Sequence, residues 1–275
     1  MKGVILAGGS GTRLYPLTKV TSKQLLPVYD KPMIYYPLTT LILAGVTEVL
    51  VITRPKDASS FKALLRDGSE LGIDISYAEQ ENASGLAQAP LIAEDFLKGE
   101  GFCLILGDNF LYGSGLGRKL QSLGSVEGAT VFAYKVSDPT QYGVVELDST
   151  GNPISIEEKP KAPKSDLAIP GLYFFDKEVV GICRGLKPSP RGELEISDVI
   201  KQYMLRGKLT IEALPIGTTW LDMGSFESLL QAGEFVHIVQ SRQGILIGDP
   251  ATAMRTRNIS ASAVRTTFTD DQLDL

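Results

Sequence analysis

Residues 3–14 read Gly3-Val4-Ile5-Leu6-Ala7-Gly8-Gly9-Ser10-Gly11-Thr12-Arg13-Leu14, and they are the most informative part of the sequence. An apolar run typical of a strand stops at a cluster of glycines, and Arg13 follows at once. Glycine lets the backbone approach a ligand closely, and successive free N–H groups can surround an anion. Arg13 can hold a phosphate through two parallel hydrogen bonds, and Lys23 and Gln24 follow within one short loop. The stretch therefore predicts a polyphosphate pocket at the end of a strand.

Two familiar phosphate-binding motifs do not fit this loop. A P-loop needs the pattern G-x-x-x-x-G-K-[S/T], and no lysine stands in the required place. The dinucleotide pattern G-x-G-x-x-G, started at Gly9, would need a glycine at Leu14. The alternative is a tight strand-to-helix turn without a ligand, but a bare turn has no need of Arg13 and Lys23.

Length and composition are those of an ordinary soluble globular enzyme. The chain has 275 residues, of which 43% are hydrophobic and 21% are charged. A net charge of −5 argues against a nucleic-acid-binding protein but permits a local cationic pocket. We expect a cytoplasmic protein, because no apolar run approaches a membrane span and glycines interrupt the N-terminal apolar stretch. Cys103 in a buried strand and Cys183 in a helix are expected to remain free thiols.

Strand-like and helix-like segments alternate through the first half of the chain. Strands are expected at residues 3–7, 48–53, 75–80, 102–107 and 129–136, and helices at residues 33–44, 61–66 and 85–97. The run at 102–107 is apolar throughout, as in a strand that is buried on both faces. This alternation predicts an α/β fold with a mostly parallel twisted sheet flanked by helices.

The second half of the chain has a different pattern. Two strand-like runs within residues 142–160 flank a turn at 149–153, which predicts an antiparallel hairpin. Further strands are expected at 167–175 and 209–216, and a helix at 195–206. No linker or internal repeat is visible, so we expect one unit with two functional parts.

Ligands of open α/β sheets bind at the carboxyl ends of the strands. The glycine loop follows one such end, and Asp108 follows the strand expected at 102–107. Two separate parts of the sequence therefore point to a single crevice.

Several distinctive motifs follow one another in a specific order along the chain. They are residues 8–14 and 22–38, then Leu106-Gly107-Asp108-Asn109, Tyr142-Gly143-Val144-Val145, Glu157-Glu158-Lys159-Pro160, Gly171-Leu172-Tyr173, Arg191-Gly192-Glu193-Leu194-Glu195-Ile196 and Trp220-Leu221-Asp222. Together they resemble the sugar-1-phosphate nucleotidyltransferases. The resemblance implies a Rossmann-like nucleotidyltransferase domain over residues 1–245, with a nucleotide-binding part at 1–136 and an antiparallel sugar-binding part at 137–245. Residues 246–275 would form a short tail with oligomer or regulatory contacts.

The resemblance also implies a reaction and its substrates. The closest members transfer a deoxythymidylyl group from dTTP to glucose 1-phosphate, in the first step of dTDP-deoxysugar synthesis. The attacking sugar phosphate is already an anion, so the reaction needs charge neutralisation and in-line alignment, and it needs no general base. Several cations and a metal are therefore expected, without a Ser-His-Asp arrangement. The sole histidine, His237, lies in an expected helix and is interpreted as a surface or packing residue.

Two aspartates are the expected metal ligands. Asp108 and Asp222 each follow a strand-like run, and the resemblance places both on Mg²⁺. Two carboxylates about 4 Å apart repel by about 4 kcal/mol at an effective dielectric constant near 20. A divalent cation removes this repulsion and binds phosphate at the same time. The alternative makes Asp108 a simple turn residue, because Asp-Asn favours turns.

The resemblance assigns roles to other residues of this sequence. Arg13 and Lys23 would hold the triphosphate, and Lys159 would bind the sugar phosphate, although a solvated lysine beside two glutamates is the alternative. The amide of Gln80 and the backbone of Gly85 would recognise the base. The implied nucleotide-binding residues are Leu6, Gly8, Gly9, Gly11, Thr12, Gln24, Gln80 and Gly85, and the implied sugar-binding residues are Gly143, Glu158 and Tyr173.

The sequence departs from the family pattern at three places. Asn82-Ala83-Ser84 replaces the usual proline and aspartate, so the sequence does not decide whether the nucleotide base is thymine or uracil. Pro170 replaces a threonine, which leaves an amino or deoxy sugar open. Ser114 replaces a frequent histidine, and the tail is short, so weaker feedback control is expected. Residues 261–271 are expected to be partly disordered.

Three other functions remain as alternatives. One is a uridylyltransferase or another nucleotidyltransferase of the same architecture. Another is a silent regulatory subunit, which the presence of every expected charged residue opposes. The third is a nicotinamide-dependent oxidoreductase, which the glycine spacing opposes. Family analogy also implies a homo-oligomer, most often a tetramer.

Overall fold

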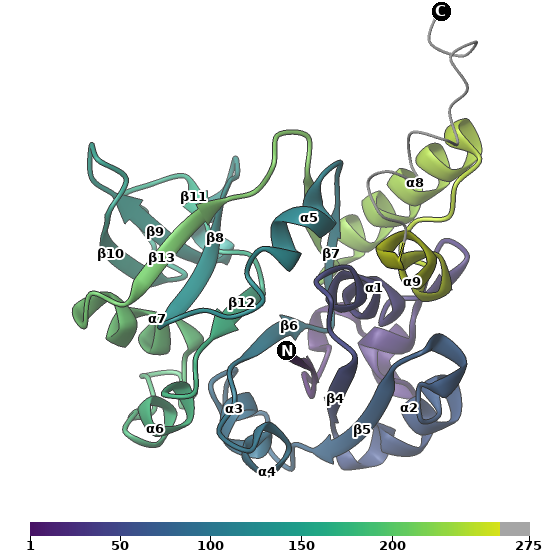
Figure 1. Ribbon diagram of the computed structural model, residues 1–275, viewed down its shortest axis with the longest axis horizontal. Coiled ribbons are helices and arrows are strands. Elements are labelled where there is room, and N and C mark those ends of the chain that lie inside the picture. The colour runs from purple at the N-terminus through teal and green to yellow at the C-terminus, as the bar shows by residue number, and fades with distance from the viewer. Residues whose placement is uncertain (259–275) are drawn as a thin grey trace, which may run out of the picture.

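A computed structural model describes residues 1–258 of the chain (Figure 1). The tail segment 261–271, for which partial disorder is expected, lies outside these residues. The strands are β1 (Lys2–Ala7), β2 (Pro27–Val28), β3 (Lys31–Pro32), β4 (Glu48–Thr53), β5 (Asp74–Glu79), β6 (Phe102–Leu106), β7 (Asn109–Tyr112), β8 (Ala129–Lys135), β9 (Gly143–Leu147), β10 (Pro153–Glu158), β11 (Leu167–Ala168), β12 (Leu172–Phe175), β13 (Leu209–Ala213) and β14 (Thr219–Asp222). The α-helices are α1 (Tyr35–Leu43), α2 (Ala58–Leu65), α3 (Gln88–Ile92), α4 (Glu94–Leu97), α5 (Leu116–Gln121), α6 (Val179–Arg184), α7 (Ile196–Leu205), α8 (Phe226–Gln243) and α9 (Pro250–Asn258).

A large mixed sheet forms the centre of the molecule. Its strand order is β10-β9-β11-β8-β12-β6-β1-β4-β5, and β13 also pairs with β8. The strands β6, β1, β4 and β5 are parallel, and β12 runs antiparallel between β6 and β8. The β9–β10 hairpin extends the antiparallel side, as the turn at 149–153 predicts. The predicted α/β class with a mostly parallel sheet and an antiparallel region is confirmed.

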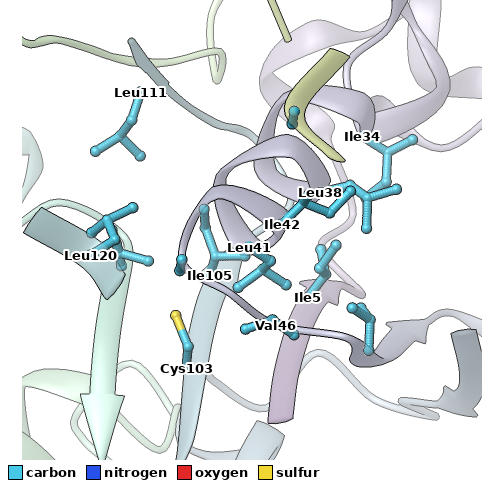
Figure 2. Close-up of a cluster of buried hydrophobic side chains, with 14 of the residues drawn as sticks. Ile5, Ile34, Leu38, Leu41, Ile42, Val46, Cys103, Ile105, Leu111 and Leu120 are labelled. Carbon is cyan, nitrogen blue, oxygen red and sulfur yellow. The ribbon is translucent and has the colours of Figure 1, made fainter. Parts of the chain in front are cut away.

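Alternation along the parallel strands produces one apolar cluster on each face of the sheet. In β1, Ile5 and Ala7 belong to one cluster, whereas Val4 and Leu6 belong to the other. Figure 2 shows the first cluster, in which side chains of α1 gather with Ile5 of β1 and Ile105 of β6. Helices α3, α4, α6 and α7 contribute to the second cluster. Helix α9 packs against α1, so residues 250–258 of the predicted tail belong to the folded body.

A second, small sheet pairs β7 with β14 although the two strands lie far apart in the sequence. The antiparallel register places Asp222 opposite Asn109 and Trp220 opposite Leu111. Because β7 begins one residue after Asp108, this ladder brings the two predicted metal ligands to the same end of the sheet. The main-chain N–H of Met223 donates to the carbonyl of Asp108 at 2.9 Å and closes that end.

Some predicted elements differ in extent from those observed. The expected helix at 85–97 begins only at Gln88 and divides at Ala93 into α3 and α4, because Gly85 has a positive φ that no helix continues. The expected strand at 167–175 divides into β11 and β12, because Pro170 has no N–H to donate and the chain crosses there to another neighbour. The helix predicted from Met33 begins at Tyr35, since the N–H groups of Met33 and Ile34 bond to the preceding loop.

The two cysteines and the sole histidine lie in the kinds of element predicted for them. Cys103 in β6 and Cys183 in α6 are both buried free thiols. His237 lies in α8, and its ring contacts Tyr29 with 5.1 Å between centroids. Within residues 1–258, no helix combines the length and the apolarity that crossing a membrane requires.

Candidate active site

Two adjoining hollows lie at the carboxyl ends of the parallel strands. Their volumes are about 290 and 130 Å³, and they form one crevice because they share six lining residues: Arg13, Leu86, Leu106, Asp108, Glu158 and Lys159. The larger hollow also contains the predicted nucleotide-side residues Leu6, Gly9, Lys23, Gln24, Gln80 and Gly85. The smaller one contains the predicted sugar-side residues Gly143 and Tyr173, together with Asp222. Except for Glu158, which lines both hollows, the residues predicted for the nucleotide and those predicted for the sugar line different hollows where they line one at all.

The glycine loop connects β1 to a short 3₁₀ turn at Thr12–Leu14. Thr18 donates its hydroxyl hydrogen to the carbonyl of Gly11 at 2.8 Å, and Leu14 is fully buried, so the loop is anchored at both points. Arg13 is exposed, with its guanidinium beside Gly224 at the end of β14. The loop thus presents a free cation to the crevice, while Gly8, Gly11 and Thr12 shape the loop without lining the hollows.

Gln80 is fixed at the bottom of the nucleotide-side hollow. It is 4% exposed, and its Nε2 donates to Oε1 of Gln88 at 2.7 Å. A Cβ on Gly8 would lie only 2.0 Å from Oε1 of Gln80, so a side chain at position 8 would displace the amide. This close approach explains in physical terms why the loop needs glycine there. The Gln80 amide is held in one orientation, as recognition of a base edge requires.

Gly85 lies against the main chain of Leu194 on the opposite wall. The N–H of Leu194 donates to the carbonyl of Ser84 at 2.8 Å, and the N–H of Ala87 donates to the carbonyl of Leu194 at 3.0 Å. Gly85 has φ +111°, and a Cβ there would meet the oxygen of Leu194 at 2.3 Å. Both the conformation and the space therefore require glycine.

Gly85→Ala is expected to lower the free energy of unfolding by about 3 kcal/mol or more, because backbone strain and a main-chain clash combine. Gly151→Ala is the matched control, since Gly151 also has a positive φ, of +88°, but a Cβ there would meet nothing within 4 Å. The control should lose only about 1–2 kcal/mol. Denaturant unfolding measures both values. Equal losses would contradict the packing of Gly85 on Leu194.

Asp108 and Asp222 have opposite electrostatic environments. Asp108 forms an ion pair with the buried ammonium of Lys23 and accepts a hydrogen bond from Nδ2 of Asn109 at 3.2 Å. Burial opposes its ionisation, but the charge and hydrogen bond of Lys23 hold the pKa of Asp108 below its ordinary value. Burial and the charge of Asp108 raise the pKa of Asp222, although a hydrogen bond from Tyr142 partly opposes this. In the free protein, burial and the negative charge of Asp108 therefore disfavour the ionised form of Asp222.

The donor set of this pair fits Mg²⁺. Within residues 1–258, no group of three or more His, Cys, Asp or Glu side chains is arranged to hold a metal by itself. Mg²⁺ typically takes one or two carboxylates and completes its shell with water and substrate phosphate oxygens. Two hard oxygen donors that repel each other beside a polyphosphate pocket match this pattern.

The sugar-side hollow is built on the β9–β10 hairpin. Glu158 pairs with Gly143 in the ladder, and Oε2 of Glu158 would lie 3.5 Å from a Cβ on Gly143. Burial raises the pKa of Glu158 above its ordinary value despite the opposing charge of Lys159. Burial also raises the pKa of Tyr173 far above its ordinary value, so its hydroxyl stays a donor. Lys159 ends the hairpin with φ +44°, an unusual backbone conformation for a residue with a side chain.

Three further residues of the crevice carry no role in the sequence analysis. Asn109 is 2% exposed, and its Oδ1 accepts from the indole N–H of Trp220 at 2.7 Å and from the N–H of Gly171 at 2.9 Å. Tyr142 donates to Asp222. Arg191, which lines the nucleotide-side hollow, donates three hydrogen bonds to Glu195, two from Nη2 at 2.8 and 2.9 Å and one from Nε at 3.1 Å. All three lie inside the motifs quoted in the sequence analysis, and that position is the feature of the sequence that could have identified them as site residues.

Comparisons with known proteins show the family to which the chain belongs. The model of the nucleotidyl transferase family matches residues 2–238. A glucose-1-phosphate thymidylyltransferase of Mycolicibacterium smegmatis is 55% identical over 250 residues, which are 91% of this chain and 87% of that protein. The corresponding Neisseria meningitidis enzyme is 55% identical over 248 residues, 90% of this chain and 86% of its own.

Solved structures give the same picture of the fold. A crystal structure from Bacillus anthracis, assigned as a glucose-1-phosphate thymidylyltransferase and containing sucrose, matches with a TM-score of 0.81 and 38% identity. The match covers 92% of this chain and 99% of that one. A UDP-glucose pyrophosphorylase complexed with UDP-glucose matches with a TM-score of 0.76 at 24% identity, covering 86% of this chain and 98% of its own, which indicates a common fold.

Proposed function

The chain belongs to the nucleotidyl transferase family, and we propose that it transfers a deoxythymidylyl group from dTTP to α-D-glucose 1-phosphate. The products are dTDP-glucose and pyrophosphate. The observation that carries this proposal is the single crevice, in which a carboxylate pair lies between a polyphosphate loop and a sugar-side hollow. Relatives with this name, at 55% identity over nine tenths of the chain, support the choice of substrates.

The reaction forms one bond to the α-phosphorus of the nucleotide and breaks another. A phosphate oxygen of glucose 1-phosphate attacks, the bond between the α-phosphorus and the β-bridging oxygen breaks, and the electron pair leaves with pyrophosphate. No residue has to remove a proton, because the attacking oxygen is already anionic. Arg13 and Lys23 would hold the triphosphate and neutralise the leaving group, and Lys159 would hold the sugar phosphate in line.

Asp108 and Asp222 would hold Mg²⁺. When bound, the cation neutralises charge on the reacting phosphates. Lys23 pairs with Asp108 in the free protein, so its ammonium lies next to the place where the nucleotide phosphates would enter. Lys23 thereby keeps Asp108 ionised and ready for a cation.

The base and the sugar are the finer parts of this proposal. Gln80 would read the pyrimidine edge, with Leu6, Gly9, Gln24 and Gly85 around the nucleotide. Ala83, from the segment that departs from the family pattern, lines the same hollow. Discrimination by the single methyl group of thymine is worth only about 1–3 kcal/mol. We therefore expect dTTP to be preferred over UTP by no more than about two hundredfold.

The test is pyrophosphate release with Mg²⁺ and glucose 1-phosphate, with dTTP, UTP, ATP, CTP and GTP compared in parallel. We expect release with dTTP and weaker release with UTP. A preference for UTP would keep the mechanism and establish the uridylyltransferase alternative, with Ala83 as the first position to exchange. Silence with every nucleotide and with amino or deoxy sugar phosphates would favour the regulatory-subunit alternative.

The region after residue 245 supports a proposal about assembly and regulation. A separate cavity of about 480 Å³ lies between α1, α5 and α9 and shares no lining residue with the crevice. We propose that residues 246–258 make regulatory contacts there, with weak feedback control because Ser114, where the family often has a histidine, lies between two residues that line this cavity, Gly113 and Gly115. Large apolar side chains are exposed on α8, at Phe226, Leu230 and Ile238, and they support a homo-oligomer, a tetramer by family analogy, acting in the cytoplasm.

A further inference from the structure

Tyr142 contacts both halves of the crevice. Its hydroxyl donates to Oδ1 of Asp222 at 3.0 Å. Its carbonyl oxygen accepts from the main-chain N–H of Lys159 at 2.9 Å. One residue is thereby bonded to a proposed metal ligand on one side and to the proposed sugar-phosphate lysine on the other.

The ring of Tyr142 is held against the strand that carries Asp222. Its centroid lies 4.9 Å from the centroid of Trp220. Trp220 and Asp222 are two residues apart in β14, so their side chains project from the same face of that strand. The tyrosine therefore contacts β14 at two successive positions, through its ring and through its hydroxyl. Two-point contact fixes the orientation of the hydroxyl toward the carboxylate.

This arrangement determines which oxygen of Asp222 stays available. Oδ1 is taken by Tyr142, whereas Oδ2 lies toward Gly224, where a Cβ would be 3.3 Å from Oδ2 and 2.8 Å from Nη2 of Arg13. Oδ2 thus points toward the glycine loop. In the free protein the charge of Asp108 repels Asp222, and a freely rotating carboxylate would turn away from its partner. The hydrogen bond from Tyr142 opposes that rotation.

We propose that Tyr142 is a positioning residue that holds Asp222 in the orientation needed for a divalent cation and joins that ligand to the Lys159 turn. The inference rests on the metal assignment in the proposed function. Asn109 plays the corresponding role for Asp108. Its Nδ2 donates to Asp108, and its Oδ1 accepts hydrogen bonds from Trp220 and Gly171. Both carboxylates are therefore oriented from behind by side chains that do not themselves bind the cation, an arrangement typical of metal sites.

Tyr142→Phe tests this inference because it removes the hydroxyl and keeps the ring on Trp220. Tyr134→Phe is the matched control, since Tyr134 packs on the same indole with 5.5 Å between centroids and, within residues 1–258, makes no hydrogen bond to Asp222. Asp222→Asn gives the effect of losing the ligand. The binding readout is the electron paramagnetic resonance signal of free Mn²⁺, titrated into the complex with dTDP-glucose.

Tyr142→Phe is expected to weaken Mn²⁺ binding about tenfold and to raise the half-saturating Mg²⁺ concentration in pyrophosphate release by a similar factor. The KM for glucose 1-phosphate at saturating Mg²⁺ should stay at the wild-type value, because the carbonyl of Tyr142 and its bond to Lys159 are unchanged. A merely packing role would instead leave the Mg²⁺ dependence unchanged. Circular dichroism and the thermal midpoint verify that each variant is folded.

The outcomes separate this inference from the proposed function. Mn²⁺ binding by Tyr142→Phe that equals binding by the wild type would overturn the positioning role and leave the metal assignment intact. Equal binding by Asp222→Asn and wild type would overturn the metal assignment and the inference with it. A loss of the same size in Tyr134→Phe would show that the effect does not depend on the hydrogen bond to Asp222 and would also overturn the inference.

Discussion

Asp108→Asn and Asp222→Asn should each reduce turnover at saturating Mg²⁺ by at least about a hundredfold, which is the effect of removing one preorganised electrostatic contact to a transition state. The reaction brings two anionic reactants together, and these carboxylates are the groups that would hold a neutralising cation between them. Asparagine preserves the shape of each side chain and the β7–β14 ladder that positions it. The measurement is steady-state pyrophosphate release across a range of Mg²⁺ concentrations.

The same two substitutions should differ in their effect on stability in metal-free buffer. Asp108 is paired with Lys23, whose side chain is 10% exposed, so Asp108→Asn strands a buried charge and should destabilise the fold by about 3 kcal/mol. Asp222 is disfavoured as an anion by burial and by Asp108, so Asp222→Asn relieves a repulsion and should not destabilise the fold. Denaturant unfolding with a chelator present measures both free energies.

Asp148→Asn is the control for loss of an aspartate elsewhere. Asp148 accepts hydrogen bonds from Thr150 and Asn152 in the exposed β9–β10 turn, away from the residues that line the crevice. We expect some loss of stability in this control and unchanged turnover. Near-wild-type turnover in either of the other variants would contradict the metal assignment of that aspartate.

The sequence allowed the parallel half of the fold to be predicted because its signals are local. The apolar run before Gly8 and the apolar run before Asp108 each form a buried strand, and parallel strands present their carboxyl ends at one edge. Once both strands lie in the same sheet, the glycine loop and Asp108 must meet. The N–H of Gly107 donates to the carbonyl of Leu6 at 3.0 Å and joins these two ends directly.

The supporting residues of the crevice could not be predicted in the same way. The contacts of Asn109 and Tyr142 depend on the pairing of β7 with β14, which joins segments about a hundred residues apart. Their position inside the motifs marks both residues in the sequence, but it does not show which side chains they contact. The division of residues 167–175 into two strands likewise depends on which neighbour each half pairs with, although Pro170 was a local sign of the break.

Lys159 has two competing interpretations, a lysine that binds the sugar phosphate and a solvated surface lysine. Lysine beside Glu157 and Glu158 is an ordinary solvated pattern in the sequence. In the structure Lys159 lines both hollows, and its backbone has φ +44°. Strained backbone conformations of non-glycine residues persist where surrounding contacts enforce them, and here the bond from the Lys159 N–H to Tyr142 does so.

Lys159→Ala should therefore lower kcat/KM for glucose 1-phosphate by about a hundredfold or more, because a cation that holds and aligns the attacking phosphate is lost. Lys159→Gly should lose as much activity, yet be more stable than the alanine variant by about 1 kcal/mol, since glycine adopts a positive φ without strain. Lys164→Ala is the matched control, because Lys164 lies in the following loop and pairs with Glu157 at 3.5 Å. Initial rates at varied glucose 1-phosphate and saturating dTTP give the comparison. If Lys159→Ala and Lys164→Ala had equal kcat/KM values, Lys159 would be a solvated lysine. Another cation of the crevice, such as Arg191, would then have to hold the sugar phosphate.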